Sequence, residues 1–251
     1  MYSWSKHSSN KPVSHEQTPQ AIAPIGETVF PRDDDTADSQ GPVQSSTPVS
    51  EPHQQADELL NTAYTLQKAG QFETALKAFQ QTYLAYRELQ HPLGQIKALN
   101  GIGLSFYNLK HYAKAIEYSE QSLQLAAICQ DKRLLVKILS TLGNAYRHLK
   151  DQTKAIDYQQ QSLRVAQKVG DRRGEMAALN NLGLAYKALG DHESAVTFEQ
   201  RSLTIARELK DQQVEEQILK NLGNACYALG NFTQAIEYYQ QRLDLAYQAK
   251  D

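Results

Sequence analysis

The sequence predicts an all-α fold, a solenoid of five stacked helix-turn-helix repeats behind a disordered N-terminal tail. Identical residues recur at intervals of 40 positions over most of the chain, and self-similarity at such a period is typical of repeat architectures. Within each interval the apolar residues follow the three-and-four spacing of amphipathic helices. Composition separates the tail, because seven of the eight prolines lie before residue 53.

Residues 1–56 form the expected tail. They are dense in Ser, Thr, Gln and Asp, with seven acidic residues against three basic ones, and such a segment cannot bury enough apolar surface to offset its ordering entropy. Residues 21–32 are an apolar island followed by three aspartates, Asp33 to Asp35. The favoured interpretation is a passive spacer. The alternatives are a linear motif for a partner and an internal competitor for the chain's own groove.

The repeats follow the tail as one domain, residues 57–251, with expected repeat bounds at about 57–96, 97–136, 137–176, 177–216 and 217–251. The last four repeats share a glycine column and an alanine column. These columns hold Gly103, Gly143, Gly183 and Gly223, and Ala115, Ala155, Ala195 and Ala235. The first repeat matches more loosely.

Each repeat contains two helices. The first carries an apolar stripe made of Leu99, Ile102, Gly103 and Phe106. The second carries an equivalent stripe between residues 115 and 126. In the link between the two helices, Gly190 is expected to supply the left-handed residue that ends one helix, and Asp191 to cap the next.

A glycine inside a helix costs about 1 kcal/mol relative to alanine, so its recurrence requires a compensating contact. Close packing of the two helices supplies one, because Gly103 has no side chain and Ala115 has only a methyl group. One such pair leaves an apolar face uncovered. Neighbouring pairs are therefore expected to stack into a continuous core.

These residues carry a family resemblance. The segment from Asn181 to Tyr186 (Asn-Leu-Gly-Leu-Ala-Tyr), the link 189–191 and the later Ala195 and Leu203 resemble a tetratricopeptide repeat. The 40-residue period is similar to the longer variant in Pins-type adaptors and bacterial multi-repeat proteins. The resemblance covers residues 57–251 and implies a right-handed superhelical solenoid whose concave face binds proteins.

The resemblance has departures in its end repeats. Cys226 stands where earlier repeats have an aromatic residue, and Leu66 stands there in the first repeat. Arg242 replaces the small residue found at Ser122 and its equivalents. Terminal repeats are commonly atypical.

A second stripe on the first helices is expected to face the inner curve, and we call it the first-helix stripe. It comprises residues 97, 100, 104 and 107 and their equivalents in the next three repeats. None of these sixteen residues is acidic, five are cationic and four are asparagine. The predicted binding residues are Lys97, Asn100, Tyr107, Lys137, Asn144, Arg147, Asn180, Lys187, Lys220, Asn224 and Tyr227.

Such a stripe suits an extended, acidic peptide. Asparagine amides pair with both the donors and the acceptors of a peptide backbone, while Lys and Arg bind carboxylates. In some members of the family, paired Lys and Asn residues hold a C-terminal carboxylate, but no complete set of this kind can be assigned here. The alternative is that these polar residues only keep an exposed helix solvated.

The apolar residues of the last repeat predict a contact with a covering partner or segment. Its apolar residues Ala235, Tyr239 and Leu243 have no following polar helix to cover them, and repeat arrays usually need such a cap for solubility. A partner, a second copy or a longer architecture would provide the cover.

Composition argues against several other classes. Residues 57–251 carry a formal charge of +2, since −2 belongs to the whole chain and −4 to the tail, so nucleic acid is not the expected partner. No apolar run is long enough to span a membrane. Cys129 and Cys226 are isolated in the sequence. Such cysteines are most often buried as small apolar side chains, and unpaired thiols favour a cytoplasmic location.

No metal or cofactor is expected, because no His or Cys cluster has ligand spacing. No nucleophile or acid-base pair suggests an enzyme, and Gly101-Ile-Gly103 lacks the preceding strand of a dinucleotide site. The predicted function is a protein-interaction scaffold or adaptor. The alternative is a regulatory or assembly-factor module that senses a peptide and acts through a separate enzyme.

Overall fold

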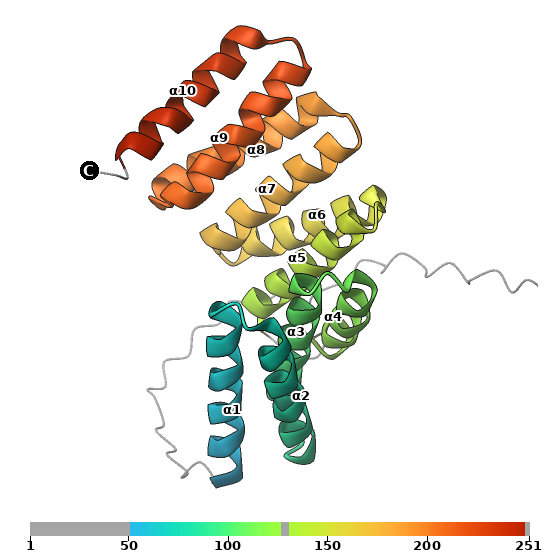
Figure 1. Ribbon diagram of the computed structural model, residues 1–251. Helices are drawn as coiled ribbons and strands as arrows, with labels where there is room; N and C mark the ends of the chain where they lie inside the picture. The colour runs from blue at the N-terminus through green and yellow to red at the C-terminus, as the bar shows by residue number, and fades with distance from the viewer. Residues whose placement is uncertain (1–50, 127–130, 249–251) are drawn as a thin grey trace, which may run out of the picture. The chain divides into compact units, whose positions relative to one another are not determined.

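The computed structural model describes residues 51–126 and 131–248, which form ten α-helices and no strand. Residues 1–50 of the expected tail, which include its apolar island, lie outside the described residues, as does Cys129. Figure 1 shows the helices following one another as five antiparallel pairs. The pairs are α1 (Glu51–Lys68) with α2 (Phe72–Glu88), α3 (Pro92–Asn108) with α4 (Tyr112–Ala126), α5 (Lys132–His148) with α6 (Gln152–Lys168), α7 (Arg172–Ala188) with α8 (His192–Glu208), and α9 (Gln212–Ala228) with α10 (Phe232–Gln248).

Each helix packs on its neighbours in the chain, as the stacked-pair prediction requires. The first helices of successive pairs also touch directly, α1 with α3, α3 with α5, and α5 with α7. The first helices therefore form one layer and the second helices form another. The predicted all-α solenoid of stacked helix pairs is confirmed.

The helix pairs begin five residues before the expected repeat bounds at 97, 137, 177 and 217. The reason lies in three aspartates that recur at intervals of 40 residues, Asp131, Asp171 and Asp211, which cap the first helices α5, α7 and α9. A carboxylate oxygen of Asp131 accepts a hydrogen bond from the backbone N–H of Leu134 at 3.0 Å, and Asp171 bonds Gly174 in the same way at 3.0 Å. Helix α1 also begins earlier than expected, at Glu51, inside the range assigned to the tail.

The links between helices contain a residue with positive φ. Glycine provides it at Gly190 (φ 81°) and at three other turns, as the sequence predicts for Gly190. Four other turns use a residue with a side chain, and Lys150 has a φ of 66°. The left-handed conformation is disfavoured for residues with a Cβ, so these turns are held by the packing of the flanking helices.

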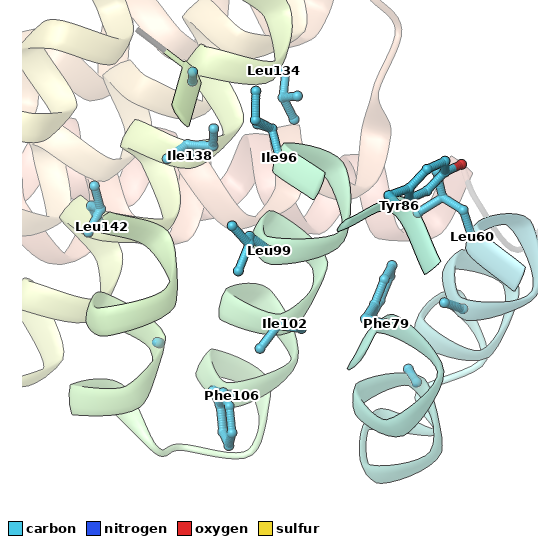
Figure 2. Packing of buried hydrophobic residues seen from close by; sticks show 14 of the residues in the cluster. Leu60, Phe79, Tyr86, Ile96, Leu99, Ile102, Phe106, Leu134, Ile138 and Leu142 are labelled. Atoms are coloured by element: carbon cyan, nitrogen blue, oxygen red, sulfur yellow. The ribbon is translucent and has the colours of Figure 1, made fainter. Parts of the chain in front are cut away.

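The core is built from the predicted apolar stripes. Leu99 and Ile102 are each 1% exposed, and Phe106 is 7% exposed. Figure 2 shows these side chains of α3 beside those of the neighbouring helices α2 and α5. A second group of buried residues, from Leu163 to Leu222, continues the core through the later helices.

The close approach at the glycine column is confirmed. A Cβ atom added to Gly103 would lie 2.5 Å from the Ser119 hydroxyl and 3.3 Å from the Ala115 carbonyl oxygen. At Gly183 the nearest atom would be Cγ of Glu199, also at 2.5 Å. The space left by each glycine is thus filled by the residue four positions after the conserved alanine.

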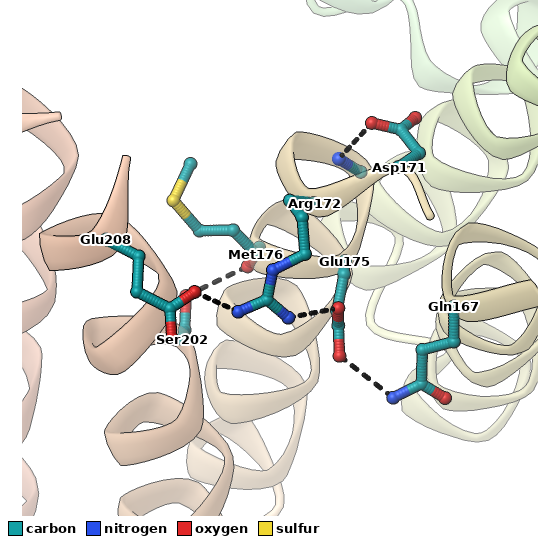
Figure 3. Close-up of polar contacts among 8 residues, drawn as sticks. Gln167, Asp171, Arg172, Glu175, Met176, Ser202 and Glu208 are labelled. Carbon is teal, nitrogen blue, oxygen red and sulfur yellow. Dashed lines mark hydrogen bonds and ion pairs between the residues drawn. The ribbon is translucent and has the colours of Figure 1, made fainter. Parts of the chain in front are cut away.

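The small-residue column of the second helices bonds the backbone of the first helices. Ser202 donates its hydroxyl hydrogen to the carbonyl oxygen of Met176 at 2.9 Å, as Figure 3 shows, and Ser122 and Ser162 make the equivalent bonds. In the last pair, Arg242 cannot make this bond and instead forms an ion pair with Glu216 at 2.9 Å. The departure at Arg242 is therefore matched by a change on α9.

Ion pairs join α7 to its neighbours. The Arg172 guanidinium bonds Glu175 at 2.7 Å and also bonds Glu208 of α8. Glu175 in turn accepts a hydrogen bond from the amide of Gln167 on α6 at 3.0 Å. These contacts, drawn in Figure 3, bridge three consecutive helices.

Candidate functional site on the first-helix layer

The first-helix stripe lies on α3, α5, α7 and α9, and most of its polar side chains reach the surface. Lys137, Lys220 and Tyr227 are exposed. The half-buried members are Lys97, Tyr107, Asn144, Arg147, Asn180, Lys187 and Asn224. The stripe is therefore accessible along its length, with one exception.

Asn100 is the exception, because only 4% of it is exposed. Its equivalent on α5, Ser140, accepts a hydrogen bond from the side chain of Asn181 on α7 at 3.4 Å. This column therefore faces the seam between successive first helices. The seam accounts for the burial of Asn100, which is poorly placed to contact a ligand.

The five cations of the stripe have no carboxylate within ion-pair distance in the described part of the chain. The ion pairs of the described residues instead involve Lys154, Arg172, Arg173, Arg207 and Arg242. Among the described residues, the positive charge of the stripe is thus not paired with a carboxylate. Such a row of exposed and half-buried cations attracts anionic groups.

A polar and aromatic cluster borders the stripe where α3, α4 and α5 meet. The rings of Tyr112 and His148 stack with centroids 4.5 Å apart and planes 3° apart. The Tyr107 hydroxyl lies 3.1 Å from Nε2 of His148, and Nη2 of Arg147 lies 3.3 Å from the same atom. Burial and the charge of Arg147 lower the pKa of His148. In a neutral ring Nε2 carries one lone pair and accepts one hydrogen bond, so Tyr107 and Arg147 are alternative donors to it.

Beneath the stripe lies a second layer of side chains that the sequence analysis did not connect with the binding surface. It consists of the residues that fill the glycine spaces, namely Ser119, Gln159, Glu199 and Tyr239. The available signal was their position four residues after the conserved alanine, on the face of the second helix that meets the glycine. We call this set the floor column.

Two floor residues bond asparagines of the stripe. Nε2 of Gln159 donates to the carbonyl oxygen of Ser140 at 3.1 Å and to Oδ1 of Asn144 at 3.2 Å. The Tyr239 hydroxyl donates to Oδ1 of Asn224 at 2.8 Å. Both asparagines are thereby tied to the second helix of their own pair.

Glu199 is the anomalous floor residue. Its side chain is 0% exposed, and neither carboxylate oxygen has a hydrogen-bond partner among the described residues. Burial raises its pKa from 4.5 to about 8, and the nearby charge of Lys187 opposes this shift. The residue above it is Leu184, where the bonded repeats have asparagine. Glu199 is therefore largely neutral at pH 7.

Within residues 51–126 and 131–248, no helix is both long and apolar enough to cross a membrane. In the same part of the chain, no three His, Cys, Asp or Glu residues are grouped so that they could hold a metal ion.

Solved structures show where this architecture occurs. BtubC (BKLC) from P. vanneervenii is 20% identical, with a TM-score of 0.69 over 77% of this chain and 80% of that one. A putative kinesin light chain of Podosopora anserina is 18% identical, with a TM-score of 0.64 over 80% of this chain and 99% of that one. A Rap protein complexed with competence and sporulation factor is 18% identical, with a TM-score of 0.68 over 77% of this chain and 54% of that one. At these identities the likeness shows a shared fold.

Family profiles give the more specific result. Three profiles, each described as tetratricopeptide repeat, match residues 60–127, 134–208 and 218–251. No curated protein matches the chain. The profile matches together span most of the ten helices, and the chain belongs to the tetratricopeptide-repeat family.

Proposed function

We propose that this protein is an interaction scaffold or adaptor, acting in the cytoplasm, that binds an extended acidic segment of another protein along the first-helix stripe. The observation that carries the proposal is the row of five cations without a carboxylate partner. A ligand that supplies carboxylates would neutralise this row. The tetratricopeptide fold supports the general role, since repeat solenoids present extended binding surfaces of this kind.

The same surface also suits a regulatory or assembly-factor module. Such a module would sense a peptide on the stripe and pass the signal to a separate enzyme. The described residues suggest no catalytic chemistry of their own, and the Rap protein of similar fold was solved with a bound factor. Identifying the partner separates the two roles, because an enzyme among the captured proteins favours the second.

Capture of partners by the immobilised full chain, followed by mass spectrometry, tests the proposal. Replacing Asn144 and Arg147 together by alanine removes one amide and one cation from the stripe. We expect the double variant to keep its helical circular dichroism and to lose the partners of the wild type. Equal capture by both proteins would contradict the proposal.

We also propose that the outer face of α10 associates with a second copy of the chain. Its apolar residues are exposed, with Phe232 at 56%, Ile236 at 66% and Tyr247 at 62%. The counterpart of Ile236 on α4, Ile116, is only 9% exposed because the next helix pair covers it.

The order of these residues favours a second copy as the occupant. The exposed apolar residues of α10 have an aromatic residue at each end (Phe232 and Tyr247), an aliphatic residue next to each (Ile236 and Leu243), and Tyr239 near the centre. Two antiparallel α10 helices related by a two-fold axis would therefore match aromatic with aromatic and aliphatic with aliphatic.

Light scattering after size-exclusion chromatography tests this association. We expect the wild type to form dimers and the variant with Ile236→Glu and Leu243→Glu to be monomeric. A matched control is Gln240→Glu, which adds a charge to the same helix beside these apolar residues. A wild type that stays monomeric across a wide concentration range would contradict the association.

A further inference from the structure

We propose that the floor column sets the hydrogen-bonding polarity of the binding groove, so that α5 and α9 offer N–H donors to a ligand while α7 offers an apolar contact. This inference rests on the proposed peptide-binding function. It adds the kind of group that a ligand must place over each repeat.

The orientation of Asn144 follows from the bonds of Gln159. A backbone carbonyl oxygen only accepts hydrogen bonds, so the Gln159 atom facing Ser140 O at 3.1 Å must be the donor Nε2. The second hydrogen on Nε2 then meets Asn144 at 3.2 Å, and the atom of Asn144 that receives it must be the acceptor Oδ1. The chain of bonds leaves no freedom to turn the Asn144 amide around.

Asn144 consequently turns its Nδ2 away from the floor. Asn144 is half-buried, and its Nδ2 bonds no other described residue. In Asn224 the Tyr239 hydroxyl donates to Oδ1 at 2.8 Å, which likewise leaves Nδ2 for the groove. Both side chains therefore present a donor to the groove, and that of Asn144 has no alternative orientation, whereas a hydroxyl beneath Asn224 could also accept. A ligand satisfies them with a carboxylate or a backbone carbonyl oxygen.

Helix α7 lies between α5 and α9 in the row of first helices, and its pair differs from theirs at both the stripe position and the floor position. Leu184 replaces the asparagine, and Glu199 replaces the donor beneath it. Helix α3 shares the apolar residue, since Leu104 lies above Ser119. At position 104 and its equivalents, the four first helices from α3 to α9 thus carry leucine, asparagine, leucine and asparagine in turn. The ligand predicted by this alternation is an extended peptide in which hydrogen-bond acceptors and apolar side chains alternate from one repeat to the next.

Gln159 and Tyr239 are positioning residues in this account, because they act through the asparagines. The first test therefore needs no ligand. In the free protein, NMR hydrogen exchange of the side-chain amides should show slow exchange at Gln159 Nε2 and fast exchange at Asn144 Nδ2. Protection of Asn144 Nδ2 with fast exchange at Gln159 would overturn the assigned orientation.

The second test uses an array of synthetic peptides in which acidic, neutral polar and apolar residues are varied one position at a time. Gln159→Met keeps the side-chain length over Gly143 and removes both donors. We expect it to keep the wild-type melting temperature within a few degrees and to weaken binding of acidic peptides by about tenfold to a hundredfold, the value of one hydrogen bond to a charged group.

A reciprocal exchange provides the matched control. Leu184→Asn together with Glu199→Gln gives α7 the residue pair of α5, and should add a preference for an acceptor at that position of the peptide. Leu184→Asn alone places the amide above an acid and should not reproduce the same preference. Asn144→Leu should convert the acceptor preference at α5 into an apolar one.

The outcomes separate this inference from the proposed function. If the wild type binds peptides and all variants keep its position-by-position preferences, the floor column plays no part while peptide binding stands. If the wild type binds no peptide of the array, the proposed ligand class fails, and the amide-exchange measurement alone decides the orientation of Asn144.

Discussion

At the scale of single residues, Glu199 shows how strongly one position can depart from its repeat. Gln159 uses its Nε2 to donate to the carbonyl oxygen of Ser140, although its Oε1 is buried without a partner among the described residues, and a carboxylate cannot donate. A protonated Glu199 can make the equivalent bond to the carbonyl oxygen of Asn180. Burial without a partner therefore favours the neutral acid.

Glu199→Gln should stabilise the protein at pH 8 by about 1 to 3 kcal/mol, because glutamine fills the site without a charge. The folded-state pKa of Glu199 is raised from 4.5 to about 8. Between these values the folded protein holds a proton that the unfolded chain has released, so wild-type stability falls as pH rises from 4.5 to 8. Urea unfolding at several pH values measures this slope.

The variant should lack this slope. Glu193→Gln, which removes an exposed acid of the same helix, should leave the slope in place. Parallel stability curves for the wild type and Glu199→Gln would show that the carboxyl group is ionised without penalty in the fold.

The sequence could identify the asparagines and cations of the stripe, because their column positions recur. It could not identify their bonding partners. Whether Asn144 acts as a donor or an acceptor depends on Gln159, which lies on another helix. The burial of Asn100 also escaped prediction, because it depends on how closely α5 approaches α3.

At the scale of helices and turns, the periodicity predicted both helices of each repeat, and the core residues at Leu99, Ile102 and Phe106 are confirmed. The ends of the helices were harder to place. The expected repeat bounds placed Asp131 and Asp171 near the close of a repeat, whereas each caps the helix that follows. Side chains can cap in either direction of the chain, and only the bond to Leu134 shows which helix Asp131 serves.

The turns between helices allow a direct test of how the left-handed backbone conformation affects stability. Lys150 has a φ of 66° where the next helix pair has Gly190 with a φ of 81°. Lys150→Gly should raise the free energy of unfolding by about 0.5 to 1 kcal/mol, since relief of the left-handed strain exceeds the added entropy of the unfolded chain. Thermal unfolding measures the change.

The reverse exchange is the control. Gly190→Lys should lower stability by a similar amount, because nothing lies within 4 Å of a Cβ at that glycine and only the backbone conformation is affected. An unchanged melting temperature in both variants would show that the left-handed turns carry no measurable strain.

At the scale of the whole molecule, stacking of the helix pairs follows from burial, since each pair leaves an apolar face for the next. The same logic accounts for α10, whose outward face remains exposed in the described residues. The proposed location of the binding surface rests on charge, because acids are absent from the first-helix stripe. The identity of the ligand is not encoded in this way, since one fold serves many partners.

The central claim is that the first-helix stripe recognises acidic peptides. Its most direct test is the affinity of the captured partner's acidic segment, measured by titration calorimetry for the wild type, for Asn144→Ala with Arg147→Ala, and for Lys77→Ala with Arg164→Ala. The last pair removes two exposed cations from second helices. We predict at least a tenfold loss for the stripe variant, equivalent to about 1.4 kcal/mol, and no change for the control. Equal losses in both variants, or none in either, would contradict the account.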